Sequence, residues 1–202
     1  MSNDPFRKTC LVSYPDPADL PPSLREKLNI LPFRRNIIHT ITQSRGLAPH
    51  LISLVGACFD GKQRSLPVLD WQLIVLRVAT VLDCKYEWDV NLPVSEAHGM
   101  PQDKIQRIGC PASSVVSGKG PWTDRERVLL RLVDEQLAKY TNAEETIREA
   151  LGCLSEGALV EVLIVIGLYA TLARLIKGLR IDDDPEVPGL KELIGGAITA
   201  TE

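Results

Sequence analysis

The sequence predicts an all-α protein, a helical bundle, on three observations. From about Ser23 onward, apolar residues recur at helical spacing, and no stretch shows the alternation of a half-buried strand. Residue patterns typical of helix N-termini occur at Thr123 and Ser155. The chain has 202 residues, of which 45% are hydrophobic, enough to bury a sizeable core. We therefore expect one domain, or two closely related halves of one.

The N-terminal segment, residues 1–22, carries five prolines. Proline lacks a backbone donor and disfavours helix, so we expect an extended arm that lies over the body and can contact a neighbouring subunit. The first residues lack the basic stretch and apolar core of a secretory signal, so the expected localisation is cytoplasmic.

The first predicted half covers about residues 23–108. A run over 66–82, with a proline near its start, is apolar on nearly all sides, as in a helix buried in a bundle or an interface. Asp83 is expected at a turn or an N-cap. Residues 100–105 predict a turn into a short helix, and the Gly-, Ser- and Pro-rich stretch 109–120 predicts a loop that separates the halves.

The second predicted half, about 121–180, begins with a capping box. Thr123 accepts from the amide three residues ahead and Glu126 reaches back, which predicts a helix to about Lys139. Asn142, with a glutamate three residues later, repeats the pattern and predicts another helix start.

Gly152 is placed to end that short helix in a left-handed turn. Ser155 then predicts the cap of a long helix to about Leu179. Its most apolar part, 162–173, falls short of the roughly 20 residues that span a membrane, so we expect a buried core helix. Residues 181–202 are expected to form a C-terminal tail.

A short internal match supports two related helical halves. Residues 70–78 align with residues 124–132 at a constant offset, and Glu126 of the second half corresponds to Gln72 of the first. An internal duplication is therefore predicted, although amphipathic helices also resemble one another by chance.

Charge and residue spacing exclude several classes of partner. The net charge is −3 and no basic stripe follows the chain, so nucleic acid is not an expected partner. The three consecutive aspartates at 182–184 are expected to be a solvated linker and not a metal site. Five cysteines and three histidines lie far apart, without Cys-x-x-Cys or zinc-site spacing, so neither a metal nor a cofactor is expected.

The most distinctive stretch begins at Cys84. On a helix, Cys84, Glu87 and Asn91 are three and four residues apart, which places a thiol, a carboxyl and an amide on one face. The spacing predicts that three polar groups converge there.

This stretch resembles the carboxymuconolactone decarboxylase and alkylhydroperoxidase D-like family. Members carry Glu-Tyr-Glu-Trp-x-x-His on this helix, or Cys-x-x-Cys-x-x-x-His in the peroxidase branch, where the present chain has Lys-Tyr-Glu-Trp-Asp-Val-Asn from residue 85. The resemblance implies an alkylhydroperoxidase D-like helical bundle that assembles as a homo-oligomer, such as a dimer, trimer or hexamer. It extends from about Asn36 to a closing pattern matched by Leu159, Glu161, Leu163, Gly167, Tyr169, Ala173, Arg174 and Leu175.

The positions at which this chain differs from the family's motif determine which reactions are expected. By the resemblance, Cys84 stands at the first cysteine, Glu87 at the second, Asn91 at the histidine and Gln72 at the proton-relay glutamate. Three of these four groups are changed. Disulfide exchange needs a second thiol, and amides do not replace a carboxylate or an imidazole in proton transfer, so Cys-x-x-Cys peroxidase activity is not expected.

Each remaining candidate residue has a chemical and a structural interpretation. Cys84 is either a thiolate favoured by the helix dipole or an inert buried thiol. Glu87 is either a general acid or base with a pKa raised by burial, or the partner of an arginine, Arg77 or Arg131. Asn91 and Gln72 are either a polar clamp on a substrate oxygen or ordinary core amides. Trp88, Tyr86 and Tyr169 either line a pocket or pack.

The preferred function is therefore a cofactor-independent lyase or isomerase that acts on a small cyclic carbonyl compound, with Glu87 transferring protons. Decarboxylation, dehydration, isomerisation and cyclisation all pass through an enolate-like species that one acid and amide clamps could serve. The alternatives are a non-catalytic ligand-binding or scaffold protein of the same fold, and a thiol-based redox protein that uses Cys84. Self-association is also expected, because the predicted helices at 66–82 and 162–175 are apolar on many faces.

Overall fold

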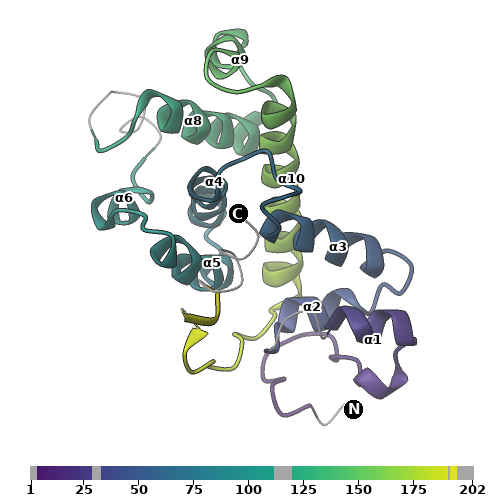
Figure 1. Ribbon diagram of the computed structural model, residues 1–202. Helices are drawn as coiled ribbons and strands as arrows, with labels where there is room; N and C mark the ends of the chain where they lie inside the picture. Colours follow the sequence, from purple (N-terminus) through teal and green to yellow (C-terminus); the bar gives the residue numbers. More distant parts are fainter. Residues whose placement is uncertain (1–3, 29–32, 112–119, 191, 195–202) are drawn as a thin grey trace.

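The computed structural model describes residues 4–28, 33–111, 120–190 and 192–194. This part of the chain consists of helices, turns and loops and contains no strand (Figure 1). The all-α prediction is confirmed. Most of the expected loop at 109–120 lies outside the described residues.

Helix α4 (Val68–Val81) lies at the centre of the bundle. It contacts α5 (Lys85–Ala97), α8 (Asp124–Lys139) and α10 (Glu156–Leu179) (Figure 1), and ten of its fourteen residues are buried. The predicted buried helix is confirmed. Because its apolar faces are covered within one chain, α4 gives no support to the oligomer interface that its composition suggested.

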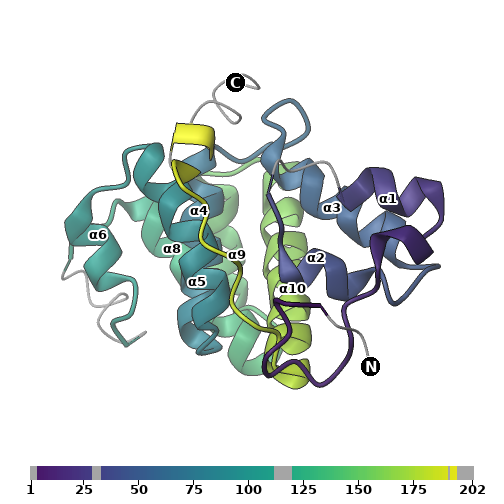
Figure 2. The same ribbon diagram turned by 90° about the horizontal axis from the view of Figure 1, so that it is seen from below.

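Three short helices precede α4 and pack beside α10 (Figures 1 and 2). These are α1 (Pro22–Leu28), α2 (Asn36–Ile41) and α3 (Ala48–Phe59); α2 contacts both α3 and α10, and α1 contacts α3. They form a second wall of the bundle, opposite α5.

The proline-rich N-terminal segment is folded more closely than an extended arm. It includes a short 3₁₀ helix at Pro17–Asp19, and it buries Cys10, Tyr14 and Leu20. The Leu11 amide donates to the carbonyl of Leu179 at the end of α10. The segment therefore adds side chains to the core.

Of the two capping boxes predicted in the second half, the structure confirms the one at Thr123 and contradicts the one at Asn142. The capping box of Thr123 and Glu126 forms both of its bonds, and α8 ends at Lys139 as predicted. The predicted cap at Asn142 is wrong, because α9 (Glu144–Leu151) begins after Ala143 and has no side-chain cap of its own. A carboxylate of α8, that of Glu135, accepts from the Ala143 amide instead.

Gly152 does end α9, but in a right-handed conformation with φ −72°, so the predicted left-handed turn is wrong. The chain stays right-handed there because it passes at once into another tight turn, in which the Leu154 amide donates to the Ala150 carbonyl. Ser155 caps α10 as predicted, with its hydroxyl accepting from the Ala158 amide. The short helix predicted from residue 100 is α6 (Gln102–Arg107).

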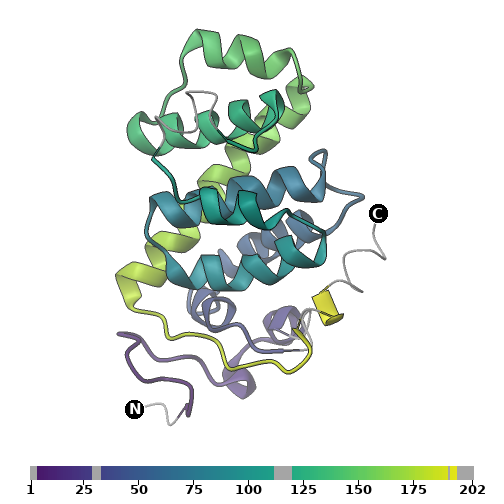
Figure 3. The same cartoon turned by 90° about the vertical axis from the view of Figure 1, so that its left-hand side faces the viewer.

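Helix α10 runs the length of the molecule (Figures 1 and 3). By length and composition alone it could cross a membrane, but 56% of its most apolar window is buried inside the protein, as in a core helix. Its outer face remains apolar, with Val160 56% and Ile164 48% exposed.

Two of the three aspartates after α10, Asp182 and Asp184, are anchors, so the expectation of a solvated linker is wrong for them, whereas Asp183 is exposed. The segment that carries them runs back across the bundle beside α5 (Figures 2 and 3). The Asp182 carboxylate accepts from the amides of Lys8 and Thr9 and from the Tyr14 hydroxyl. Asp184 pairs with a second set of groups: the Arg35 guanidinium, the Asn36 amide and the Tyr86 hydroxyl.

Candidate functional site

The corner between α4 and α5 sets the position of Cys84. Asp83 takes the left-handed conformation with φ 49°, and the Cys84 amide then donates to the Ala79 carbonyl at 2.8 Å. Asp83 is thus at a turn, one of its two predicted positions. Cys84 is the N-cap residue of α5, although its side chain makes no capping bond.

Glu87 is buried in the first turn of α5 without a charged partner. The residue is 3% exposed, and neither carboxyl oxygen makes a hydrogen bond of ordinary geometry with the described residues. The predicted ion pair is wrong, because Arg77 binds Asp134 with two bonds at 2.7 and 2.9 Å, and Arg131 pairs with Glu149.

Burial is therefore the main influence on the pKa of Glu87. Loss of hydration raises its pKa to about 8, and the neighbouring Cys84 thiol opposes this rise. Near pH 7 the side chain is accordingly a neutral carboxylic acid in roughly nine molecules of ten. The acid–base interpretation of Glu87 is the one that its surroundings favour.

The thiolate interpretation of Cys84 is contradicted by its environment. Burial, followed by the negative charge of Glu87, raises the pKa of the Cys84 thiol to about 11. The neighbouring Lys85 does not offset this rise, because its side chain is exposed and pairs with Asp89. Loss of hydration outweighs the helix dipole, so Cys84 is a neutral thiol at physiological pH.

The amides expected to form a clamp lie behind Glu87 in a buried polar chain. Asn91 Nδ2 donates to the Glu87 carbonyl at 2.8 Å, and the Ser95 hydroxyl lies 3.1 Å from Gln72 Oε1. Asn91 Oδ1 and Gln72 Nε2 have no hydrogen-bond partner among the described residues. Ser95 was not predicted, although its position four residues after Asn91 places it on the same helix face.

Four of the seven predicted residues share one cavity of about 70 Å³. Glu87, Asn91, Tyr86 and Tyr169 line it, together with apolar side chains from α2, α3 and α10. We call it the inner cavity. Gln72, Cys84 and Trp88 are not among its lining residues, so direct substrate contact by these three is not supported.

Neither tyrosine of the inner cavity is ionised near neutral pH, and the hydroxyl group of Tyr86 is already bound within the chain. The Tyr86 hydroxyl donates to Asp184 at 2.6 Å and accepts from the Ile37 amide at 3.2 Å, which fixes the ring. Burial raises the pKa of Tyr169 well above its ordinary value, so this phenol is also neutral. Tyr86 can therefore offer a ligand only its ring.

Two further residues of the inner cavity, Arg35 and Phe59, were missed by the sequence reasoning. Arg35 precedes α2 and pairs with Asp184 at 2.9 Å, whereas Phe59 ends α3 and packs edge-on against Trp71 with ring centroids 4.9 Å apart. Both lie outside the α4–α5 motif, and no local pattern marks them. Among the described residues, no group of three or more His, Cys, Asp or Glu side chains could hold a metal ion.

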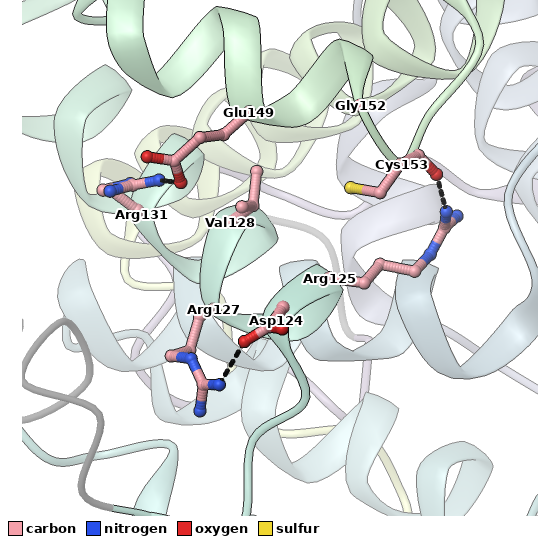
Figure 4. A pocket seen from close by; sticks show the side chains of 8 residues that line it. All are labelled: Asp124, Arg125, Arg127, Val128, Arg131, Glu149, Gly152 and Cys153. Carbon is pink, nitrogen blue, oxygen red and sulfur yellow. Dashed lines mark hydrogen bonds and ion pairs between the residues drawn. The ribbon is translucent and has the colours of Figure 1, made fainter.

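A second concavity of about 400 Å³ lies at the surface between the start of α8 and the end of α9 (Figure 4). It shares no lining residue with the inner cavity. Three arginines line it, and each is already bound within the chain: Arg125 to Asp70 and the Cys153 carbonyl, Arg127 to Asp124, and Arg131 to Glu149.

Comparison with known proteins supports the fold. No protein-family model matches the chain, and no curated protein sequence matches it either. Among solved structures, a peroxidase-related protein from Silicibacter sp. TM1040 is 14% identical with a TM-score of 0.73, covering 94% of this chain and 100% of that one. A peroxidase-related protein with an alkylhydroperoxidase AhpD core, from Ralstonia eutropha JMP134, is 13% identical with a TM-score of 0.71, covering 88% and 94%.

The debrominase Bmp8 is also similar, at 15% identity and a TM-score of 0.60, covering 89% of this chain and 88% of that one. At these identities the likeness shows the fold alone. The chain thus has the AhpD-like fold that its sequence resemblance implied, and this fold is compatible with an enzyme.

Proposed function

We propose that this protein of AhpD-like fold is a cofactor-independent lyase or isomerase in which Glu87 transfers a proton to or from a small cyclic carbonyl compound. One observation carries the proposal: a buried carboxyl group that lines a small cavity and has no partner among the described residues. A buried acid without a partner costs stability, and groups of this kind are concentrated at functional sites.

The protonation state of Glu87 indicates which half of the reaction comes first. With a pKa raised to about 8, the resting side chain is an acid at neutral pH. After carbon dioxide leaves, it can give its proton to an enolate-like carbon, and the carboxylate that remains recovers a proton from water when the product is released. In a dehydration it can give its proton to the departing hydroxyl group, and the carboxylate then takes the proton from the carbon next to the carbonyl group, which restores the acid.

The surrounding groups fit this role without titrating themselves. Asn91 lines the cavity, and only one of its two amide hydrogens is used, by the Glu87 carbonyl. The second hydrogen can stabilise a developing oxyanion. Gln72 and Ser95 hold the helix face behind it, so we assign them a positioning role.

The rival proposal is a non-catalytic protein that kept the fold, and the size of the inner cavity favours it. About 70 Å³ is well below the roughly 300 to 1,000 Å³ of ordinary ligand pockets. Thiol-based redox chemistry has less support, because the pKa of Cys84 is raised and not lowered.

The test is turnover of a panel of monocyclic ketones and carbonyl-bearing lactones by the wild type and by Glu87→Gln. The variant keeps the shape and removes the proton, so we expect a loss of about 100-fold or more. Glu96→Gln is the matched control, because it makes the same change on α5 at a residue that does not line the cavity. Equal rates for Glu87→Gln and the wild type on every substrate turned over would refute the assignment, and no turnover at all would favour the rival proposal.

A further inference from the structure

A second apolar pocket, of about 100 Å³, lies beside the inner cavity among α1, α2 and α3. We call it the outer pocket. Leu28, Ile52 and Gly56 line it, and none of these residues lines the inner cavity. The described residues that line it include no carboxylate.

The two pockets share part of their walls. Ile38, Val55, Phe59 and Arg35 line both of them. Ile38, Val55 and Phe59 are only partly buried, so these side chains have room to move. One set of side chains therefore forms a wall of both the outer pocket and the inner cavity, which places the two spaces side by side.

The outer pocket also contains a polar group that the fold leaves unsatisfied. His39 lines it with 9% of its surface exposed, and its Nδ1 has no hydrogen-bond partner in the part of the chain that the structure describes. Burial, together with the charge of Arg34, lowers the pKa of His39 to about 4, so the ring is neutral near pH 7. A neutral imidazole offers one donor and one acceptor. A buried ring nitrogen without a partner is costly unless a ligand or water meets it.

We infer that the outer pocket binds the non-reacting part of the substrate, a single ring that carries an oxygen acceptor, and that His39 and Arg35 recognise this oxygen while the reacting carbon lies beside Glu87. The guanidinium of Arg35 is held for this contact by Asp184 at 2.9 Å and by the Phe33 ring, whose centroid lies 4.6 Å away. An engineered apolar cavity of about 150 Å³ holds a benzene molecule, so the two spaces together suit a compound of one ring.

The identity of the bound molecule as a substrate rests on the proposed function, whereas binding in the outer pocket does not. The test therefore measures binding. Acetophenone, a flat ring with a carbonyl group, is the probe, and its binding is followed through the NMR signals of the Ile and Val methyl groups. We expect shifts at Ile38, Ile52 and Val55.

Gly56 offers a way to fill the outer pocket without disturbing the fold. A Cβ atom added there meets nothing within 4 Å, and replacing a helical glycine usually favours the helix. We expect Gly56→Leu to weaken acetophenone binding at least about tenfold. Gly56→Ala, which adds only one carbon, should bind nearly as well as the wild type, and Gly56→Met provides a second filling variant if the leucine protein folds poorly.

Two further variants distinguish ligand binding in the outer pocket from proton transfer by Glu87. His39→Leu should weaken acetophenone roughly fivefold while leaving ethylbenzene, which lacks the oxygen, unchanged. Glu87→Gln should bind acetophenone like the wild type. If it does so and yet keeps full turnover, the proposed function fails and the outer pocket stands. Four results would each overturn the inference. The first is that acetophenone shifts only other methyl groups, and the second is that it shows no binding up to its solubility limit. The third is that both filling variants bind it as well as the wild type, and the fourth is that His39→Leu weakens both probes equally.

Discussion

Removing the buried carboxyl group of Glu87 should change how the stability of the fold depends on pH. The pKa of this group is about 8 in the folded protein against an ordinary value of 4.5. Because the folded state holds the proton more tightly, its stability is fully present below about pH 4.5 and falls as the pH rises towards 8. Glu87→Gln cannot lose a proton, so the variant should escape this fall.

The magnitude follows from the two pKa values. Between pH 5 and pH 7.5, the ionisation of Glu87 should cost the wild type about 3 kcal/mol of unfolding free energy, at about 1.4 kcal/mol per unit of pKa difference. Folded domains have only about 5 to 15 kcal/mol in total, so the effect is easily measured. Any fixed cost of the amide is the same at both pH values and cancels in the comparison.

The assay is urea unfolding, followed by circular dichroism, of wild type and Glu87→Gln at several pH values and one protein concentration. Glu96→Gln, the same substitution on α5 outside the inner cavity, reports the effect of the change itself. Free energies that stay parallel for wild type and Glu87→Gln from pH 5 to pH 7.5 would refute the argument, since they would mean that the carboxyl group titrates alike in the folded and unfolded chains.

Three other predictions follow from contacts and exposure. Iodoacetamide at neutral pH should modify the exposed Cys153 first and leave Cys84 almost unreacted, because burial raises the pKa of Cys84 to about 11. Asp182→Asn should destabilise the fold by roughly 1 to 2 kcal/mol at neutral pH, allowing for screening by water. Burial raises the pKa of Asp182, but its hydrogen bonds from Thr9, Lys8 and Tyr14 outweigh this and hold the pKa at about 2, so the difference should fade as the pH drops towards that value. Finally, we expect self-association through the exposed apolar face of α10, and Ile164→Glu should shift light-scattering masses towards the monomer.

Each of these has a clear contrary result. Alkylation of Cys84 as fast as Cys153 would restore the activated-thiol interpretation. An Asp182→Asn protein as stable as the wild type at pH 7 would mean that the hydrogen bonds to the N-terminal segment are replaced by water. A strict monomer at micromolar concentration would exclude the interface on α10.

Local sequence patterns predicted most of the helices correctly because helix ends depend on neighbouring residues. The capping box at Thr123 and the serine cap at Ser155 satisfy amides within four residues, so both could be found without the fold. Asn142 failed for the opposite reason. Its side chain binds α8 instead, with Oδ1 accepting from the Gln136 side-chain amide and Nδ2 donating to the Glu135 carboxylate, and local spacing does not show such contacts with another helix.

The sequence by itself determined the all-α class, the principal helices and the spacing that aligns Cys84, Glu87 and Asn91 along α5. Tertiary structure decided what those groups can do. The packing of α4, α8 and α10 determines whether Glu87 forms an ion pair with an arginine. It also determines whether the Cys84 thiol is hydrated or buried. Hydration and charge pairing set a pKa, and both are properties of the space around a side chain. The outer pocket, Arg35 and the anchoring aspartates depend in the same way on segments far apart in the chain.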